Sequence, residues 1–345
     1  MEILNLLHQH IIKYPLLQIQ DVAKLLYQNE FGGGHMIPNP DISLQRIVNE
    51  YVTLNDDVKN SEQAIESIGN GKSRIYLSAL SRGLTPEGLN LMFVSSANNT
   101  TGTIEQLENK IDSFIEACRN KQFSFSLTEV IEFFKKWKSE GYPTISHSDI
   151  YRTTYQPAYR VIEDFYAHSF QLIQRIYEEQ PKIVGIDGMS CSGKSTLATL
   201  LGVNFPDSNI IHMDDYFLRP EQRTSQRLAE IGGNIDYERF YDEIVSHIQD
   251  KNGLEYQPFD CSTQRLKDSI RLDWKPLLII EGSYSLHPKW SDVYDMKIFL
   301  EVSPELQKER VLKRNGPLMY DRFVNEWFPK ENAYFELYNI KKGTV

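Results

Sequence analysis

One short segment, GMSCSGKS at residues 188–195, constrains the fold of this chain more than any other feature. It matches the pattern G-x-x-x-x-G-K-[ST] and lies between an apolar segment, KIVGID (182–187), and a helical one, KSTLATLLGV (194–203). A glycine-rich loop in that place lets backbone N–H groups approach phosphates at the positive end of a helix. Because strand and helix are both predicted, we favour a nucleotide site over a glycine- and serine-rich turn that matches by chance.

The loop pattern also predicts roles for individual residues. The Lys194 ammonium would reach the terminal phosphates, and the Ser195 hydroxyl would bind Mg²⁺. The predicted cofactors are therefore ATP and Mg²⁺. The predicted nucleotide-binding residues are Gly188, Met189, Ser190, Cys191, Ser192, Gly193, Lys194, Ser195 and Thr196.

Strands and helices alternate from the loop onward. Besides 182–187, the predicted strands are 209–213, 276–280 and 296–302, and the predicted helices are 194–203, 237–250 and 304–315. Such alternation predicts a parallel sheet with helices on both faces. We therefore expect an α/β P-loop domain over residues 181–345.

The first half of the chain predicts a mainly α-helical domain over residues 1–180. Its apolar residues recur at spacings of three and four, which is the pattern of amphipathic helices. The predicted helices are 1–14, 19–31, 41–54, 103–120, 127–141 and 160–180. Since one core rarely serves 345 residues, we expect two domains with a boundary after residue 180.

Two stretches of the helical half are unusual. FGGGHMIPNP (31–40) is rich in glycine and proline, but it lacks a G-K-[ST] pattern and a preceding strand, so we do not assign it as a phosphate loop. His35 is a candidate catalytic group, although a lone histidine is more often structural. Further polar groups for such a site would come from His147, Tyr151, Arg152, Tyr155 and Arg160.

Composition weighs against several classes of function. A formal net charge of -10 disfavours nonspecific binding of nucleic acid. The three cysteines (Cys118, Cys191 and Cys261) are typical of a reducing compartment. No apolar stretch approaches the ~20 residues that a membrane span needs, and the amino terminus lacks a signal-peptide pattern. We expect a cytoplasmic protein with a small-molecule acceptor and no nucleic-acid or membrane partner, and a homo-oligomer is left open.

Carboxylates follow two of the predicted strands. Asp214 and Asp215 lie in HMDDYF (212–217), and Glu281 comes directly after 276–280. The carboxyl ends of parallel strands line the ligand crevice, where a carboxylate can accept a proton or hold Mg²⁺. The predicted magnesium ligands are Ser195, Glu281 and Asp214. A solvated loop or a helix cap is the structural alternative for the aspartates.

Two arginines, Arg310 and Arg314, lie four residues apart on one face of the predicted helix 304–315. Such a pair can clamp a phosphate as a lid closes and stabilise the charge on the transferring group. The structural alternative is a solvated basic helix face, supported by an ion pair between Glu309 and Lys313. We give this interpretation the same weight as the phosphate clamp.

The order of these motifs resembles the uridine kinase and phosphoribulokinase-like family of P-loop kinases, which includes the bacterial pantothenate kinases. The resemblance spans about residues 182–340 and rests on GIDGMSCSGKST, HMDDYF, NIDYERF, EGSYSLHP and RVLKRN. It implies that Asp214 is the catalytic base, with Asp215 as the alternative, and that Glu281 is the acid after the Walker-B strand. It implies lid roles for Arg310 and Arg314. The helical half resembles an amino-terminal extension of some bacterial members, for which the resemblance implies no activity.

The resemblance also implies an acceptor side. Family uridine kinases hold the ribose with an aspartate, which matches Asp236, and read uracil with a tyrosine and a histidine. In this chain Phe259 stands at the tyrosine position and Gln264 near the histidine. Phenylalanine cannot donate a hydrogen bond, whereas glutamine can donate and accept, so the base-reading chemistry differs. The predicted acceptor residues are Asp215, Tyr216, Asp236, Phe259 and Gln264.

Two function hypotheses follow. The first is an ATP- and Mg²⁺-dependent kinase that phosphorylates a hydroxyl of a small metabolite, with a nucleoside favoured. Its predicted catalytic residues are Asp214, Lys194, Arg310 and Arg314. The second is a nucleotide-dependent switch or ATPase whose helical domain binds a partner. Measuring ADP release with and without acceptors discriminates between them.

Overall fold

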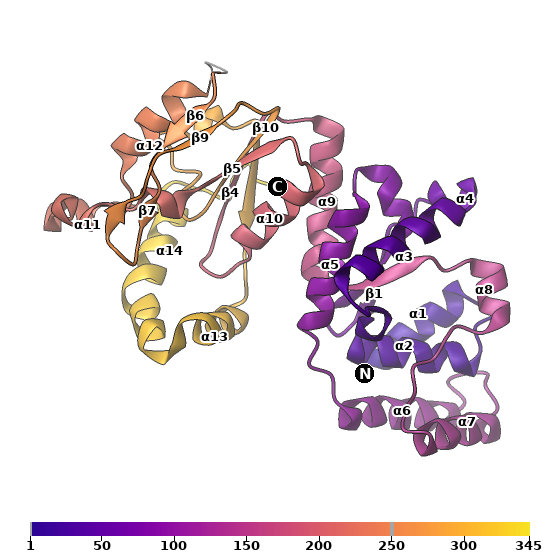
Figure 1. Cartoon of the computed structure of the whole chain (residues 1–345). Helices are drawn as coiled ribbons and strands as arrows, with labels where there is room; N and C mark the ends of the chain where they lie inside the picture. Colours follow the sequence, from indigo (N-terminus) through magenta and orange to yellow (C-terminus); the bar gives the residue numbers. More distant parts are fainter. Residues whose placement is uncertain (1, 249–251) are drawn as a thin grey trace. The chain divides into compact units, whose positions relative to one another are not determined.

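The computed structural model describes residues 2–248 and 252–345, and packing divides the chain into two compact units, Met1–Glu178 and Glu179–Val345. Each unit has a hydrophobic core of its own, built from residues of that unit alone. Figure 1 shows the helices and strands of both units.

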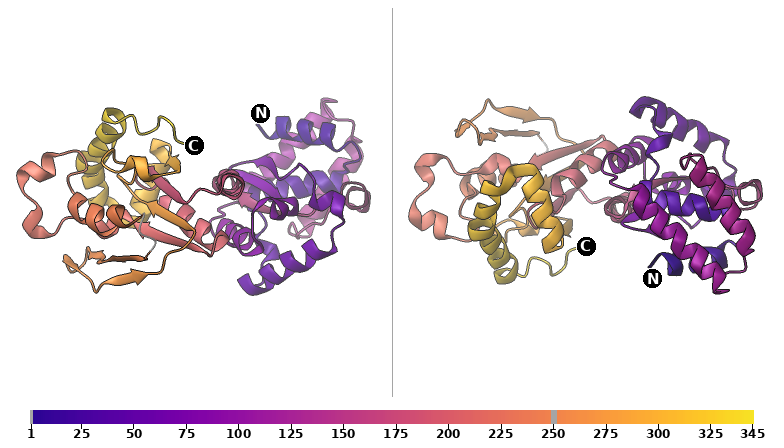
Figure 2. Two further views of the ribbon diagram at one scale, coloured as in Figure 1. Left: turned by 90° about the horizontal axis from the view of Figure 1, so that it is seen from above. Right: turned by 90° about the horizontal axis from the view of Figure 1, so that it is seen from below.

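The first unit consists of helices around a small antiparallel sheet (Figures 1 and 2). Its α-helices are α1 (Glu2–Lys13), α2 (Ile19–Phe31), α3 (Pro40–Thr53), α4 (Asp56–Lys59), α5 (Pro86–Asn98), α6 (Ile104–Arg119), α7 (Leu127–Ser139), α8 (Asp149–Tyr155) and α9 (Asp164–Glu179). Two 3₁₀ helices are η1 (Gly34–Met36) and η2 (Leu77–Arg82). The sheet has the order β1-β2-β3 and comprises β1 (Ile65–Gly69), β2 (Lys72–Tyr76) and β3 (Tyr159–Glu163).

Helix α6 shows how the sequence builds this unit. Its Leu107 and Phe114 lie on one face and are fully buried in the core. At its start, the Thr103 hydroxyl oxygen accepts a hydrogen bond from the Gln106 amide at 3.2 Å. Such a cap satisfies a backbone donor that has no partner within the helix, so the helix begins where the sequence predicts.

The sequence predicted one helix over 160–180, and this prediction is wrong at its start. Tyr159–Glu163 forms the strand β3, and α9 begins only at Asp164. In the antiparallel ladder with β2, Val161 pairs with Arg74. Periodicity cannot assign a short apolar run to a helix or a strand, and here the ladder decides. The three-stranded sheet as a whole was not predicted, because its strands are short and far apart in the sequence.

The second unit contains the predicted parallel sheet with its helices. The sheet has the order β11-β4-β10-β5 and comprises β4 (Ile183–Gly188), β5 (Ser208–His212), β10 (Leu277–Glu281) and β11 (Met296–Leu300). Its helices are α10 (Lys194–Asn204), α11 (Ser225–Ala229), α12 (Tyr237–Glu243), α13 (Pro304–Arg322) and α14 (Phe328–Leu337), with a π-helical turn over Phe323–Trp327. Two small antiparallel pairs are β6 (Leu254–Tyr256) with β9 (Ile270–Leu272) and β7 (Phe259–Asp260) with β8 (Arg265–Leu266). Four 3₁₀ turns are η3 (Met213–Tyr216), η4 (Pro220–Gln222), η5 (Val245–His247) and η6 (Ser291–Val293).

Helices cover both faces of the parallel sheet. Successive strand residues point to opposite faces, so Ile210 and Ile211 of β5 mark the two sides. Gly202 of α10 lies against Ile210, since an added Cβ would be 2.8 Å from its Cδ1. Phe240 of α12 belongs to the same buried cluster as Ile211. The sheet is therefore a buried layer between helices, as its apolar strands require.

Three strands of this sheet end side by side. Glu281, the last residue of β10, pairs with Ile186 of β4 and with His212, the last residue of β5. The segments after these strands therefore leave the sheet at one edge. That edge is where open parallel sheets bind ligands.

Helix α13 extends past the predicted end at residue 315, but it contains a kink. Gly316 has φ 76° and ψ 173°, and Pro317 follows it. Pro317 has no amide hydrogen to donate to a helical hydrogen bond. Gly316 has a positive φ, which a right-handed helix does not have, so the helix axis changes direction here.

The predicted helix over 237–250 is shorter in the structure. Helix α12 ends at Glu243, and the 3₁₀ turn η5 follows. Residues 249 and 250 of that prediction lie outside the described residues.

Candidate active site

The loop between β4 and α10 depends on its two glycines. Gly188 has φ 142°, and a Cβ at this position would lie 2.1 Å from the carbonyl oxygen of Leu300. Gly193 has φ 106° at the amino end of α10. Both values favour glycine over any residue with a side chain. The loop thus leads directly into the first turn of α10, whose free N–H groups can bind an anion.

Lys194 and Ser195, the two residues after Gly193, contact different parts of the site. Lys194 Nζ donates hydrogen bonds to the carbonyl oxygens of Gly188 at 2.8 Å and Met189 at 3.0 Å. The Ser195 hydroxyl donates to Glu281 Oε1 at 3.1 Å. The structure therefore brings together the loop and the carboxylate after β10, which are far apart in the sequence.

His212 joins this group, and sequence reasoning did not assign it a role. Its Nδ1 lies 2.6 Å from Glu281 Oε1. The hydrogen bond to Glu281 raises the pKa of His212, and burial opposes that change. The histidine stood inside the predicted HMDDYF motif, but only the pairing of β5 with β10 shows that it faces Glu281.

Asp214 and Asp215 lie in η3, directly after β5. The Asp214 side chain is exposed and Asp215 is half-buried. Desolvation by the surrounding protein, and then the Glu281 charge, raise the pKa of Asp214, although the side chain reaches solvent. Lys194 opposes that rise. Desolvation also raises the pKa of Asp215, to which the charge of Asp214 adds. Both carboxyls are thus better proton acceptors than ordinary aspartates.

Helix α13 brings both predicted arginines toward this edge. Arg310 Nη1 donates to the carbonyl oxygen of Cys191 in the loop at 3.0 Å. Arg314 is exposed, and its Nε donates to Asn315 Oδ1 at 2.9 Å. The Arg314 charge lies close enough to Asp214 to oppose the rise of its pKa.

Glu331 of α14 is a contact of the loop that sequence reasoning missed. It is only 6% exposed, and its carboxylate accepts hydrogen bonds from Ser190 N at 3.0 Å and Ser190 Oγ at 2.6 Å. Ser283 Oγ donates to it at 3.1 Å. Gln307 of α13 donates to the Ser190 carbonyl at 2.9 Å. A glutamate among the aromatic residues of this segment was the available signal.

A second buried carboxylate, Asp187, supports the base of the loop. It accepts hydrogen bonds from the amides of Gly188 and Leu286, and from the Tyr334 hydroxyl of α14 at 2.8 Å. Its side chain is fully buried, and that burial raises the pKa of Asp187 to about 6. Helix α14 therefore holds the loop region through both Tyr334 and Glu331.

Three of the five predicted acceptor residues, Tyr216, Asp236 and Phe259, are buried. The Tyr216 ring is fully buried, lies 6.0 Å from the ring of Tyr256, and has the Arg239 guanidinium 4.4 Å above it. Asp236 is 1% exposed and caps α12, and its Oδ2 accepts from Gln222 Nε2 at 3.0 Å. Neither side chain, as placed, presents a free group beside Asp214, because packing and capping engage them.

The two positions compared with uracil-reading residues are also engaged within the protein. Phe259 is 4% exposed in the β7–β8 hairpin. Gln264, at the turn of that hairpin, donates from Nε2 to the Cys261 carbonyl at 2.6 Å. The hairpin packs against η3, so it lies beside Asp214 and Asp215.

The predicted magnesium ligands lie at the start of α10 (Ser195), at the end of β10 (Glu281) and in η3 (Asp214). Among residues 2–248 and 252–345, no three His, Cys, Asp or Glu side chains form a group arranged to hold a metal ion. Mg²⁺, however, usually keeps several waters and takes one or two carboxylates with substrate phosphates. The hydroxyl of Ser195 and the carboxylates of Glu281 and Asp214 are oxygen donors of that kind and fit such an ion.

A cavity of about 470 Å³ lies beside α14. Its volume is within the range of small-molecule sites. Most of its lining residues are exposed, and no residue of the loop over 188–195 lines it. The lining residues are Asn332, Phe335, Glu336, Asn339, Lys341 and Lys342.

In the first unit, the candidate histidines do not share a site. His35 is exposed, with its ring 5.6 Å from that of Tyr27. His147 is buried between Asp21, whose Oδ1 lies 2.8 Å from Nδ1, and the Tyr159 hydroxyl, 2.6 Å from Nε2. Burial lowers the pKa of His147 to about 4. Because His147 is buried and both of its ring nitrogens have partners, we assign it a structural role.

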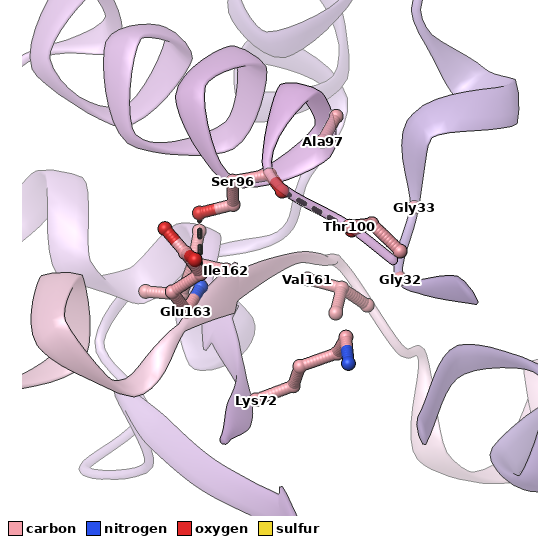
Figure 3. A pocket seen from close by; sticks show the side chains of 9 residues that line it. All are labelled: Gly32, Gly33, Lys72, Ser96, Ala97, Thr100, Val161, Ile162 and Glu163. Atoms are coloured by element: carbon pink, nitrogen blue, oxygen red, sulfur yellow. Dashed lines mark hydrogen bonds between the residues drawn. The ribbon is translucent and has the colours of Figure 1, made fainter. Parts of the chain in front are cut away.

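A pocket of about 10 Å³ lies beside the glycines of the FGGGHM segment (Figure 3). Lys72 borders it, but the Lys72 ammonium donates to the carbonyl of Asn29 at 3.2 Å. A space of this size holds no more than one water molecule. It is therefore not a site for a metabolite. The lining residues are Gly32, Gly33, Lys72, Ser96, Ala97, Thr100, Val161, Ile162 and Glu163.

The glycine-rich loop after β4, the carboxylate at the end of β10 and the parallel sheet give the second unit the architecture of a P-loop domain. No family model matches the chain. The uridine kinase of Geobacillus kaustophilus is 25% identical over 146 residues, which are 40% of this chain and 68% of that protein. A uridine kinase of Bacillus cereus is 24% identical over 173 residues, 46% of this chain and 81% of that protein. These relatives and the motifs make this chain similar in sequence to bacterial uridine kinases.

A solved structure of a possible uridine kinase from Bacillus stearothermophilus is also similar. It is 22% identical, with a TM-score of 0.38, and covers 48% of this chain and 86% of that one. In the part of the chain that the structure describes, no helix has the length and apolar character required to cross a membrane.

Proposed function

We propose that this protein is an ATP- and Mg²⁺-dependent kinase that transfers the γ-phosphoryl group to a hydroxyl of a small metabolite. One observation carries the proposal, the position of Asp214. This exposed carboxylate follows β5 at the same sheet edge as the phosphate loop and within electrostatic reach of Lys194 and Glu281. A carboxylate so placed can take the proton of an attacking hydroxyl.

In the proposed reaction, the acceptor oxygen forms a bond to the γ-phosphorus, and the bond from that phosphorus to the bridging oxygen of ADP breaks. The hydroxyl proton passes to Asp214. A raised pKa suits this role, because an ordinary aspartate is a weak base at neutral pH. Asp215 is the alternative base, because the pKa of its carboxyl is also raised.

Cationic groups would balance the charge of the transferring group. Lys194 would exchange its bonds to loop carbonyls for bonds to the terminal phosphates, and Arg310 and Arg314 would approach from α13. Mg²⁺, when bound, supplies further neutralisation of the phosphates, and Ser195 and Glu281 would hold it.

We propose a nucleoside or a related sugar as the acceptor, since the relatives are named uridine kinases. Asp215 is the predicted acceptor residue that is both accessible and next to Asp214. Net charge and the cysteine pattern support a cytoplasmic protein without a nucleic-acid partner.

The test is ADP release by the full-length protein with ATP and Mg²⁺, alone and with a panel of nucleosides, pantothenate and sugar phosphates. An acceptor that raises turnover well above the rate with water supports the kinase. If every acceptor leaves that rate unchanged, the protein is a nucleotide-dependent switch or ATPase, and the kinase proposal fails.

A further inference from the structure

The two candidate bases, Asp214 and Asp215, lie in η3, a 3₁₀ turn of only 4 residues. A turn of this length has few hydrogen bonds of its own, so contacts with neighbouring segments must fix its orientation. Helix α12 and strand β7 both pack against η3. A side chain that joins these three segments would therefore control where the two carboxylates point.

Arg239 of α12 is such a side chain. Its Nη2 donates to the carbonyl oxygen of Asp215 at 2.6 Å, and its Nη1 donates to the carbonyl oxygen of Gln257, between β6 and β7, at 2.6 Å. Its guanidinium also lies 4.4 Å from the ring centre of Tyr216, the last residue of η3. One guanidinium thus contacts η3 through a carbonyl and an aromatic face, and connects it to the strand that leads into the β7–β8 hairpin.

Carboxylates of α12 hold Arg239 itself in place. Its Nη1 also donates to Glu243 Oε2 at 3.3 Å, and its Nε lies 3.5 Å from Oδ2 of Asp236, which caps the helix. The Arg239 side chain is only 10% exposed. A lysine could not reproduce this set of contacts, because an ammonium lacks the planar fork of donors that a guanidinium has.

Arg227 of α11 provides a close comparison. It pairs with Glu238 at 2.9 Å, donates to the carbonyl oxygen of Ile235 at 3.0 Å and lies 4.1 Å from the ring centre of Tyr237. Its side chain is 17% exposed. Arg227 therefore resembles Arg239 in burial and in the kinds of contact it makes. Within the described part of the chain, however, none of its hydrogen bonds, ion pairs or ring contacts reaches η3 or the β7–β8 hairpin.

We propose that Arg239 is a positioning residue of the kinase, which acts through the backbone of Asp215 to fix η3 against α12 and the β7–β8 hairpin. This inference rests on the proposed function and adds a residue to it. The physical reason is that phosphoryl transfer and proton transfer depend steeply on geometry, so that a shift of about 1 Å can lower the rate about 10²-fold. ATP binding should not depend on Arg239, because none of its contacts among the described residues involves the loop over 188–195.

The test is steady-state kinetics of full-length variants with ATP, Mg²⁺ and the acceptor that best stimulates ADP release by the unaltered protein. Arg239→Gln should lower kcat about 10²-fold, and Arg239→Lys, which keeps the charge but not the fork, about tenfold. The Kd for ATP, measured by isothermal titration, should change by less than about twofold in both variants. Arg227→Gln is the matched control and should leave both kcat and Kd unchanged.

A second measurement separates loss of position from loss of fold. Hydrogen exchange of peptides from β4 and β10 shows whether each variant retains the parallel sheet. In Arg239→Ala, guanidinium chloride below its denaturing range should restore kcat about tenfold, because the free cation can occupy the vacated space. The same salt should not raise kcat in Arg227→Ala, and sodium chloride at equal ionic strength should restore neither variant.

The possible failures are distinguishable. If Arg239→Gln and Arg239→Lys leave kcat unchanged, the positioning role is overturned and the kinase proposal stands. A loss of kcat that Arg227→Gln shares, or that a matching loss of ATP affinity accompanies, also overturns the positioning role, because it describes a contact that only supports the fold. ADP release that no acceptor stimulates in the unaltered protein overturns the kinase proposal, and the positioning role with it.

Discussion

The two units each hold a cluster of charged side chains, and the clusters differ in how completely they are partnered. In the first unit, the Glu66 carboxylate accepts hydrogen bonds from Arg74 at 3.1 Å, Lys13 at 2.6 Å, Tyr14 at 2.7 Å and Tyr76 at 2.9 Å. Arg74 is 1% exposed and also bonds Gln28. In the second unit, Asp214 is exposed and has no hydrogen-bond partner among the described residues.

This difference separates a structural cluster from a chemical one. A buried network in which every group is satisfied fixes one packing of the core, and removing one member leaves a buried charge unpaired. Where the surroundings raise the pKa of a titratable group and no other side chain pairs with it, the group is free to exchange a proton with a ligand. We therefore expect variants in the first cluster to change stability, and variants in the second to change activity.

The largest effect is expected for Asp214→Asn. Removing the proposed base should lower acceptor-dependent turnover by about 10²–10⁴-fold, which is the usual contribution of general base catalysis. The free energy of unfolding should change by no more than about 0.5 kcal/mol, because the side chain is exposed and unpartnered. ADP release and calorimetric ATP binding measure the two effects. Weaker ATP binding with unchanged turnover would make Asp214 a structural or metal-binding residue.

Arg74→Leu is the corresponding change in the first unit. It leaves Glu66 buried without its buried cation, which should cost about 3–5 kcal/mol of stability. Hydrogen exchange of peptides from β2 and α2 reports on this unit alone. Arg119→Leu, which removes an exposed partner of Glu116, is the control and should change little. Unaltered exchange in Arg74→Leu would show that the network does not stabilise the fold.

Acid should loosen the first unit more than the second, since burial lowers the pKa values of two histidines in the first unit and of one, His287, in the second. Burial lowers the pKa values of His10 and His147 to about 4, from 6.5 for an exposed histidine. The unfolded state therefore binds protons first, so stability is full above pH 6.5 and is lost as the pH falls toward 4. At pH 5 each histidine should cost about 2 kcal/mol. Hydrogen exchange at pH 7 and pH 5, corrected for intrinsic rates, measures this loss, and His147→Gln should reduce it. Equal loosening of both units contradicts the assignment.

The smallest effect is expected for Glu331→Gln. The Glu331 carboxylate combines features of the structural cluster and the chemical cluster. The carboxylate is buried and partnered, yet its partner is the phosphate loop. An amide keeps one acceptor for the Ser190 N–H but loses the charge and the second acceptor, so the Ser190 and Ser283 hydroxyls must turn to accept, and we expect the KM for ATP to rise about tenfold with kcat little changed. Glu336→Gln, exposed on the same helix, is the control. An unchanged KM would limit Glu331 to packing of α14.

Sequence reasoning found the parallel sheet because each of its signals is local. Each apolar strand, the loop of 188–195 and the helix after it is itself a short segment, in which periodicity and glycine placement decide the structure. It missed β3 for the opposite reason. Val161 is in a strand because it pairs with Arg74, a residue far away in the chain.

The features of the candidate site fall into the same two groups, those with local signals and those that depend on distant residues. The roles proposed for Lys194, Ser195 and Asp214 come from motifs, and each motif is contiguous. The contact of His212 with Glu281 and that of Glu331 with Ser190 join segments that only folding brings together. The burial of Tyr216 likewise depends on packing against Tyr256, which no local pattern records.

By itself, the sequence predicted a glycine-rich loop after the strand 182–187 and carboxylates after two of the strands. Backbone conformation there depends on residues only a few positions apart, such as Gly188 and Gly193. The tertiary structure decided which charged groups are satisfied and which are open. Partnering depends on distance between side chains, and the fold alone sets whether Asp214 or Arg74 meets a partner.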